Sequence, residues 1–268
     1  MKKLFAILFL LSLAYADFQL QNLDVAIKLN EDGSAAVEER INVIVFGQYS
    51  MQLYESGYNK NNLASWQDVT NISEIKTHIG ANYADTRNIV VRPQPLQKSK
   101  SGLDVWYGQI IVDYSAYPYY DKNGSVANRT GLVIMDNYKP RTTRYTLNEN
   151  AFSFKRTETG DIKLDDTTTL SITPPSNALI TIVNPITEDM SNVKFPAPSR
   201  TLKWSGLTLV QFSLVYEIEQ SLDKEVLSFF SDLQQSIRAS LSSPEGLSAI
   251  AVVLVLAAAY FYLRLSRR

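Results

Sequence analysis

The sequence predicts a mainly β protein: an antiparallel β-sandwich of one large or two small units, followed by an amphipathic α-helix and a C-terminal transmembrane helix. Three observations predict this architecture. Apolar and polar residues alternate along much of the body, the apolar period changes to three and four after residue 220, and uncharged apolar runs lie near both ends. We expect the β-rich body at residues 17–220, either undivided or split near residue 116.

The composition is that of a globular protein held by its apolar core alone. Its 268 residues are 45% hydrophobic and 20% charged, the net charge is -1, and there is no cysteine. The chain has no excess of positive charge to neutralise a phosphate backbone, so the composition argues against nucleic-acid binding. The lack of cysteine excludes disulfides, thiolate metal sites and a cysteine nucleophile.

The N-terminal residues predict a signal peptide over residues 1–16. Lys2 and Lys3 form a positive start, residues 4–13 form an apolar stretch that is short for a bilayer, and an A-x-A pattern ends at Ala16. We predict cleavage between Ala16 and Asp17, which would place the body that follows outside the cell. The alternative is an uncleaved anchor or a buried helix.

The clearest strand pair is a hairpin over residues 23–45. Apolar residues stand at every second position of its first strand, and the same alternation continues through its second strand. Asp32-Gly33 lies between the two strands and favours a tight hairpin turn. Glu39 breaks the apolar alternation of the second strand.

Later segments repeat the strand signal. Residues 106–114 and 210–218 alternate, and residues 179–183 form a short apolar run that ends at a turn signal. Such alternation is typical of antiparallel sheets with one buried face. Two segments are predicted as loops: the proline-bearing residues 92–102 and the turn-rich residues 117–130.

Residues 221–242 predict an amphipathic juxtamembrane helix, because their apolar residues recur at spacings of three and four. This helix could dock on its own domain, self-associate or bind a protein partner as a short stalk, or lie on the lipid surface. We favour docking, since an apolar stripe usually packs on a core, and surface-bound helices usually carry more basic residues than this one.

Residues 246–263 predict a transmembrane helix, and the arginines of the tail at residues 264–268 predict that this end is cytoplasmic. The chain would then be a single-pass protein of the cell membrane, with its N-terminus extracellular and its C-terminus cytoplasmic, and would contact membrane lipid through this helix. The residues Ser-Pro-Glu-Gly at 243–246 also resemble C-terminal signals that transpeptidases process, so cleavage of the tail is an alternative.

No residue pattern predicts catalysis, a cofactor or a metal. His78 is the only histidine, and no G-x-S-x-G elbow accompanies it, so it reads as an ordinary strand or loop residue. A calcium-loop start at Asp121 fails because Leu132 stands where the bidentate glutamate belongs. A hydrolase with paired carboxylates stays open, because the sequence does not reveal which strand carboxylates meet. The candidates are Glu38, Glu39, Asp113, Glu217 and Glu219.

Two groups of residues are candidate surface sites. Three N-x-S/T sequons predict N-glycosylation of an extracellular domain, at Asn71, Asn123 and Asn128. A group of tyrosines around one proline predicts an interaction surface, formed by Tyr117, Tyr119 and Tyr120. The alternative for the tyrosines is that they pack their loop against the β domain.

Parts of the chain resemble known families. Residues 25–34, with Val37-Glu38-Glu39 after them, resemble the N-terminal ectodomain of DUF2207-type predicted membrane proteins. Residues 172–185 and 202–217 resemble the ectodomains of archaeal surface proteins. The resemblance implies a β-rich extracellular region joined to transmembrane helices, and an archaeal source, but no catalytic residue. The chain departs from the pattern in having one terminal span and almost no cytoplasmic part.

These observations predict a membrane-anchored binding or cell-envelope structural module that is not an enzyme. The tail after residue 263 is too short for a signalling domain, so any output must pass through partners in the membrane or through assembly outside. Two alternatives remain: an accessory subunit of a membrane complex, and an envelope hydrolase.

Overall fold

The computed structural model describes residues 16–100, 103–120, 130–139 and 141–219. Within them the protein is mainly β, as the alternation predicts, and its sheets are antiparallel and mixed. The described residues belong to one compact unit. The predicted signal peptide (except Ala16), juxtamembrane helix, transmembrane helix and tail lie outside the described residues. None of the helices in the described ranges is long and apolar enough to span a membrane.

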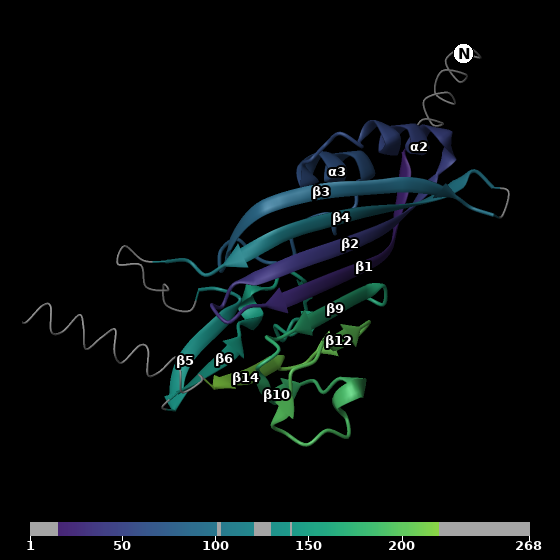
Figure 1. The fold of residues 1–268 in the computed structure, drawn as a ribbon. Coiled ribbons are helices and arrows are strands. Elements are labelled where there is room, and N and C mark those ends of the chain that lie inside the picture. The colour runs from purple at the N-terminus through teal and green to yellow at the C-terminus, as the bar shows by residue number, and fades with distance from the viewer. Residues whose placement is uncertain (1–15, 101–102, 121–129, 140, 220–268) are drawn as a thin grey trace, which may run out of the picture. The chain divides into compact units, whose positions relative to one another are not determined.

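The largest sheet has six strands in the order β12-β9-β1-β2-β4-β3 (Figure 1). Neighbouring strands are antiparallel, except that β1 and β9 run parallel. A strand from late in the chain therefore extends the N-terminal hairpin into a mixed sheet. The strands are β1 (Asp17–Leu29), β2 (Ala35–Phe46), β3 (Asp85–Lys98), β4 (Val105–Tyr117), β9 (Thr168–Thr173) and β12 (Leu202–Ser205).

Two smaller sheets complete the β structure. The second sheet has the order β11-β10-β14-β6-β5, and the third has the order β13-β8-β7. The second consists of β5 (Val133–Lys139), β6 (Thr142–Leu147), β10 (Leu179–Asn184), β11 (Ala197–Pro198) and β14 (Ser213–Glu219). The third consists of β7 (Lys155–Arg156), β8 (Ile162–Lys163) and β13 (Thr208–Leu209). Two 3₁₀ turns are η1 (Glu149–Ala151) and η2 (Glu188–Met190).

The predicted N-terminal hairpin is confirmed. β1 and β2 pair along their length, from Asp17 opposite Phe46 to Leu29 opposite Ala35. Gly33 in the connecting turn has a φ of 79°, a left-handed conformation that glycine adopts without a steric penalty. Asp32-Gly33 therefore lies in the connection, which spans residues 30–34 and is longer than a tight two-residue turn.

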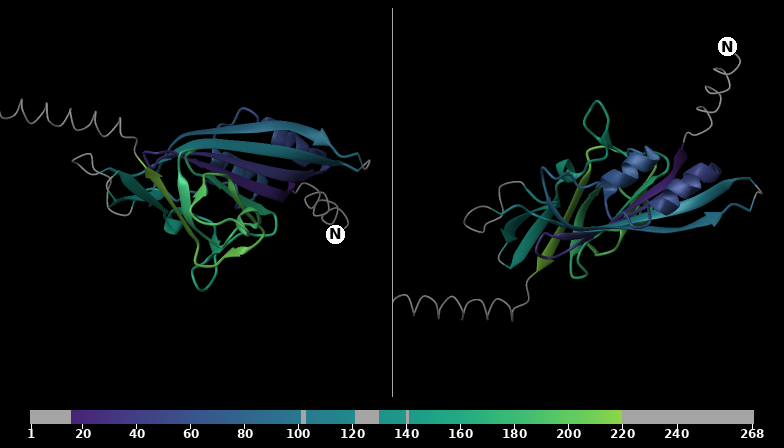
Figure 2. Two further views of the ribbon diagram at one scale, coloured as in Figure 1. Left: turned by 60° about the horizontal axis from the view of Figure 1, so that its bottom comes forward. Right: turned by 90° about the horizontal axis from the view of Figure 1, so that it is seen from above.

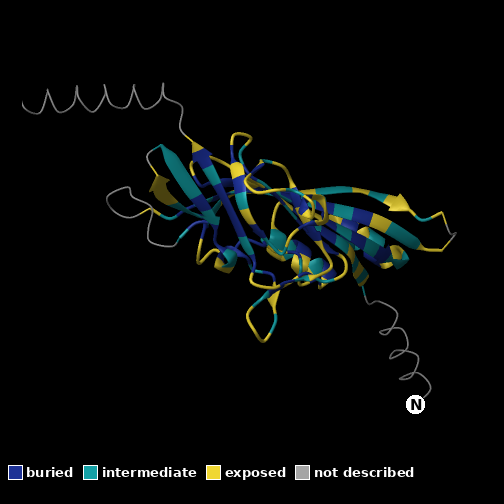
Figure 3. Ribbon diagram, turned by 90° about the horizontal axis from the view of Figure 1, so that it is seen from below, coloured by how far each residue is buried: buried dark blue, intermediate teal, exposed yellow. Residues whose placement is uncertain are grey.

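One hydrophobic core contains the buried side chains of all three sheets. On the long strands of the largest sheet, buried residues alternate with exposed or half-buried ones, so one side of that sheet lies against the core (Figure 3). The second sheet packs near the β1–β2 turn, where the Tyr145 hydroxyl donates to the Glu31 carbonyl at 2.8 Å. This arrangement leaves the opposite side of the six-stranded sheet facing solvent.

Two helices, which the sequence analysis did not predict, cover the core side of the six-stranded sheet where β1 begins (Figure 2). They are α2 (Gly47–Ser56) and α3 (Leu63–Thr70). Tyr54 of α2 and Trp66 of α3 are fully buried, with ring centroids 5.0 Å apart. Each helix is short and buries few residues, so neither leaves a long apolar period in the sequence.

The prediction of a loop over residues 92–102 is wrong for its first part, because residues 92–98 belong to β3. Pro93 and Pro95 suggested a loop, since proline cannot donate a hydrogen bond to a neighbouring strand. However, β3 is the edge strand of the sheet, and an edge strand tolerates proline where no partner needs its nitrogen.

Replacing Gly108 with alanine is expected to lower the free energy of unfolding by about 1–3 kcal/mol. A Cβ atom at this position would lie 2.8 Å from the Tyr54 ring and 3.0 Å from a Leu96 methyl group. The Tyr54 ring has little freedom to move, because its hydroxyl donates to two backbone carbonyls, at 2.9 and 3.0 Å. Thermal unfolding of the full chain in mild detergent, followed by circular dichroism, measures the effect.

Gly80→Ala is the matched control for this substitution. Its Cβ atom would approach nothing closer than 3.6 Å, so the expected change is below about 0.5 kcal/mol. Equal stability of the two variants would show that Tyr54 does not pack against β4 as described.

Candidate functional site

The candidate site is the side of the six-stranded sheet that faces away from the core. We call this side the outer face; its residues alternate with the core residues of β1, β2, β3, β4 and β9. On β1, for example, Val25 and Ile27 are buried, whereas Ala26 and Lys28 between and beyond them are exposed. Because strands hold side chains at fixed spacings, this face is a rigid platform on which register decides which side chains meet.

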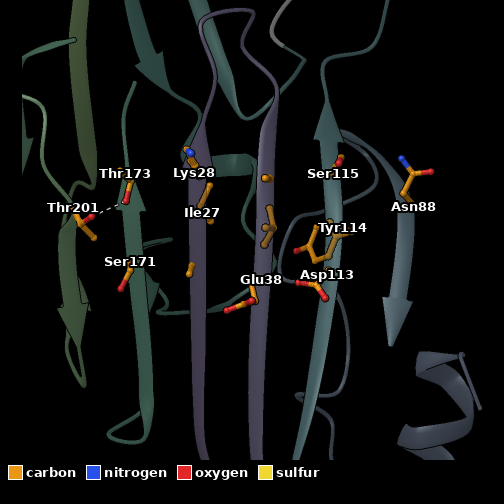
Figure 4. Close-up of a pocket in the computed structure, with 13 residues that line it drawn as sticks. Ile27, Lys28, Glu38, Asn88, Asp113, Tyr114, Ser115, Ser171, Thr173 and Thr201 are labelled. Carbon is orange, nitrogen blue, oxygen red and sulfur yellow. Dashed lines mark hydrogen bonds between the residues drawn. The ribbon is translucent and has the colours of Figure 1, made fainter. Parts of the chain in front are cut away.

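A hollow of about 550 Å³ lies on the outer face and crosses five of the six strands (Figure 4). We call it the hydroxyl hollow, because hydroxyl and small side chains line much of it: Ser115, Ser171, Thr173, Thr201, Ala26 and Ala36. The hydroxyl groups of Thr173 and Thr201 lie 2.8 Å apart and form a hydrogen bond. The small side chains of β1 and β2 leave room between the polar groups on either side.

Charged groups at the hydroxyl hollow are mostly paired. Glu38 and Asp113 lie opposite each other in register and both line the hollow. Glu38 forms an ion pair with Arg40 at 2.7 Å, and Asp113 forms one with Arg92. Lys28 also lines the hollow, and no ion pair of its ammonium group occurs among the described residues.

A second hollow, of about 440 Å³, lies further along the same face. We call it the amide hollow, because five carboxamide side chains line it: Gln21, Asn42, Gln94, Gln97 and Gln109. Tyr107, Pro95 and Gly108 complete its lining, so none of its lining residues carries a charge. Gln21 lies at a β-bulge of β1, and a bulge adds a residue to one strand and redirects its side chains.

Strand register brings these amides together. Asn22 of β1 lies opposite Asn42 of β2, Asn42 lies opposite Gln109 of β4, and Gln109 lies opposite Gln94 of β3. Four carboxamides thus form a row across four neighbouring strands. The Gln109 amide donates to the Asn42 side-chain oxygen at 2.8 Å. The row therefore contains one direct cross-strand hydrogen bond, while Asn22 donates to Asp24 at 2.8 Å and Gln94 donates to the Arg92 carbonyl at 3.3 Å.

A buried polar cluster lies on the opposite side of the same sheet. The Glu39 carboxyl group is fully buried and accepts the Tyr114 hydroxyl at 2.5 Å and the backbone N–H of His78 at 2.7 Å. The His78 Nδ1 atom lies 2.8 Å from the other Glu39 oxygen. Burial, the charge of Glu39 and the hydrogen bond to Glu39 raise the pKa of Tyr114 well above its usual value. Tyr114 therefore stays protonated, and its hydroxyl donates a hydrogen bond to Glu39.

A cavity of about 70 Å³ borders His78, which is room for about two water molecules. Ser73 also lines this cavity, but its hydroxyl donates to Glu74 at 2.7 Å. A histidine with a carboxylate behind it resembles part of a catalytic triad, but the serine that shares the cavity is engaged elsewhere. The cluster is best explained as a structural link between β2 and the loop that contains His78.

The five candidate carboxylates do not form one cluster in the structure, although Glu217 and Glu219 lie two residues apart on β14. Glu38 and Asp113 are neighbours on the outer face, whereas Glu39 lies in the core rather than on an exposed strand face. Its partner His78 lies in a loop, but it is a buried member of the core and not an ordinary surface residue. Glu217 and Glu219 belong to the second sheet, where they pair with Arg144 and Arg141.

The tyrosines predicted to form an interaction surface have different environments. Tyr120 is 53% exposed, whereas Tyr117 is half-buried under the guanidinium of Arg87, 5.3 Å from the ring centroid. The Tyr119 hydroxyl donates to the backbone carbonyl of Ala81, which ties its loop to the domain. Of the three, Tyr120 is the one that presents most of its surface to solvent.

The predicted modification sites lie partly within the described residues. Asn71 is exposed and ends α3 with a φ of 56°, so its side chain is accessible for glycosylation. Asn123 and Asn128 lie outside the described residues. At the predicted cleavage site, Ala16 precedes β1, and the backbone nitrogen of Asp17 donates to the Ser50 hydroxyl at 2.9 Å.

The amide row was not found by the sequence analysis. Its members are outward residues of strands whose alternation is visible, but they are separated by up to 87 positions between Asn22 and Gln109. In the described part of the chain, no group of three or more acidic or histidine side chains is placed to hold a metal ion.

The fold and the outer face define a mainly β domain whose exposed sheet carries neutral polar hollows. No family model matches the chain, and no curated protein is significantly similar to it. The function must therefore be inferred from the site itself.

Proposed function

We propose that the chain is a single-pass type I membrane protein whose extracellular β-sandwich is a binding module of the cell envelope, and that the outer face is its binding surface. The observation that carries this proposal is the presence of two polar hollows on one rigid, solvent-facing sheet. Their polar groups are arranged by strand register, which favours recognition because it holds donors and acceptors in fixed positions.

The chemistry of the outer face supports binding more than hydrolysis. The neighbouring carboxylates Glu38 and Asp113 favour the hydrolase alternative, since glycosidases use two carboxylates. However, each already forms an ion pair with an arginine, which occupies one oxygen of each carboxylate. The accessory-subunit alternative would use the same face to bind a membrane partner.

Ala36→Arg is expected to weaken binding to the envelope at least tenfold. Ala36 is exposed in the hydroxyl hollow, and arginine would fill that hollow with a long charged side chain. The measurement is co-sedimentation of the full chain with detergent-washed cell walls of the source organism. Both are kept in the same detergent, so insertion of the predicted transmembrane helix into a membrane does not contribute.

Asn192→Arg is the matched control, because Asn192 is exposed, lies outside the sheets and gains the same side chain. It should bind like the unaltered chain. Gln97→Arg puts the same side chain in the amide hollow, and if it and Ala36→Arg both bind as well as the control, the outer face is not the binding surface and the proposal fails.

A further inference from the structure

We infer that the amide hollow binds a neutral glycan. This inference rests on the proposed function, and it names the class of ligand that the outer face takes. It is carried by the three amides of the row that line the hollow, Asn42, Gln94 and Gln109, and by the further amides and the exposed tyrosine beside them.

The hydrogen-bonding groups of the hollow match those of a sugar. Each carboxamide offers two donors and an accepting oxygen, and each sugar hydroxyl both donates and accepts. In the described part of the chain, no hydrogen bond occupies the side-chain amides of Gln21 and Gln97. The Gln109 amide uses one donor on Asn42, which orients both groups and leaves their remaining donors and acceptors for a ligand.

The hollow also offers an apolar surface of the kind that sugar rings use. Tyr107 lines it and is 39% exposed, and its register partner on β2 is the half-buried Ile44. Tyrosine combines a flat apolar ring with a polar hydroxyl, so it contacts the C–H face of a sugar and still bonds to hydroxyls. Pro95 adds a second rigid apolar surface at the edge strand.

Charge and size favour a neutral glycan over other ligands. None of the lining residues is charged, so the hollow holds no group that would neutralise a phosphate or a uronic acid. Its volume of about 440 Å³ lies within the usual range of small-molecule sites, roughly 300–1,000 Å³. An extended peptide would instead add to the edge strand β3 through backbone hydrogen bonds, and such binding does not need amides on the sheet face.

The test uses the glycan fraction of the same cell walls, freed of protein with protease, before and after periodate oxidation of its vicinal diols. Soluble cellohexaose, mannohexaose and chitohexaose serve as defined neutral probes, and oligogalacturonate serves as the charged comparator. Titration calorimetry with the full chain in mild detergent measures binding. We expect binding to the glycan fraction, its loss after periodate treatment and no preference for oligogalacturonate.

One double variant and two single variants test the residues. Asn42→Ala combined with Gln109→Ala should weaken glycan binding about tenfold or more, because two hydrogen-bonding groups are lost. Tyr107→Ala should weaken it by a similar factor. Gln97→Ala provides a second variant whose side chain is exposed and carries no hydrogen bond in the described residues, so it tests the site even if the double variant fails to fold. Asn192→Ala, an exposed amide outside the sheets, should bind normally.

The outcomes separate this inference from the proposed function. If the chain binds intact walls and Ala36→Arg weakens that binding, but the glycan fraction does not bind and periodate has no effect, the glycan inference fails while the binding module stands. If the amide variants lose self-association instead of glycan binding, the face joins two copies of the chain and the glycan inference also fails. If Ala36→Arg and Gln97→Arg both leave wall binding unchanged, the proposed function fails and the inference fails with it.

Discussion

Replacing His78 with alanine is expected to lower the free energy of unfolding by about 3–5 kcal/mol. Glu39 is fully buried on the core side of β2, and His78 supplies the hydrogen-bonding partner of one of its oxygens. Without the ring, that oxygen would lose its side-chain partner inside the core. The ring also lies against Phe154, with centroids 4.8 Å apart, so its removal leaves a cavity as well.

A double-mutant cycle measures how much of this loss comes from the pair itself. His78→Ala, Glu39→Ala and the double variant are compared by thermal unfolding of the full chain in mild detergent. The double variant should lose less stability than the two single losses added together, because neither group is then left buried alone.

Lys76→Ala is the control within the same loop. Lys76 is exposed and its ammonium group donates to the Ser153 carbonyl at the surface, so the expected change is below about 0.5 kcal/mol. Strictly additive losses in the cycle would contradict the direct contact between Glu39 and His78.

The buried cluster of Glu39 and His78 shows which parts of the site could be predicted from the sequence and which could not. The alternation of β2 places residue 39 on the core side, so a glutamate there already indicates a buried acid that needs a partner. The partner could not be predicted, because His78 follows 39 positions later in a loop without periodicity. Alternation reveals the face of a strand but contains no information about which loop covers it.

The same limit explains which parts of the fold and of the outer face could be predicted from the sequence. The β1–β2 hairpin could be predicted because its strands are adjacent and an Asp-Gly turn sets their register. The parallel pairing of β1 with β9, and the order that places β3 at the edge, depend on contacts between distant segments. The amide row depends on both, since its four side chains come from four strands.

Removing the Trp204 side chain should destabilise the fold as much as removing the His78 side chain. Trp204→Ala is expected to lower the free energy of unfolding by about 3–5 kcal/mol. The side chain is 2% exposed on the edge strand β12, its indole N–H donates to the Pro185 carbonyl at 2.8 Å, and its ring meets that of Phe212 edge-on at 5.2 Å. The Trp204 side chain thus joins β12 to two segments outside the six-stranded sheet. The stability of this edge of the sheet therefore depends on Trp204.

Two further variants separate packing from hydrogen bonding at this position. Trp204→Phe keeps most of the ring contact but loses the indole N–H, so it should cost less than Trp204→Ala, because the Pro185 carbonyl alone loses its donor. Lys203→Ala, on the same strand but exposed, should change stability by less than about 0.5 kcal/mol. Thermal unfolding of the full chain in mild detergent compares the three variants. A loss below about 1 kcal/mol for Trp204→Ala would mean that β12 is held by backbone pairing with β9 alone, and that the hydroxyl hollow beside Thr201 does not depend on the tryptophan.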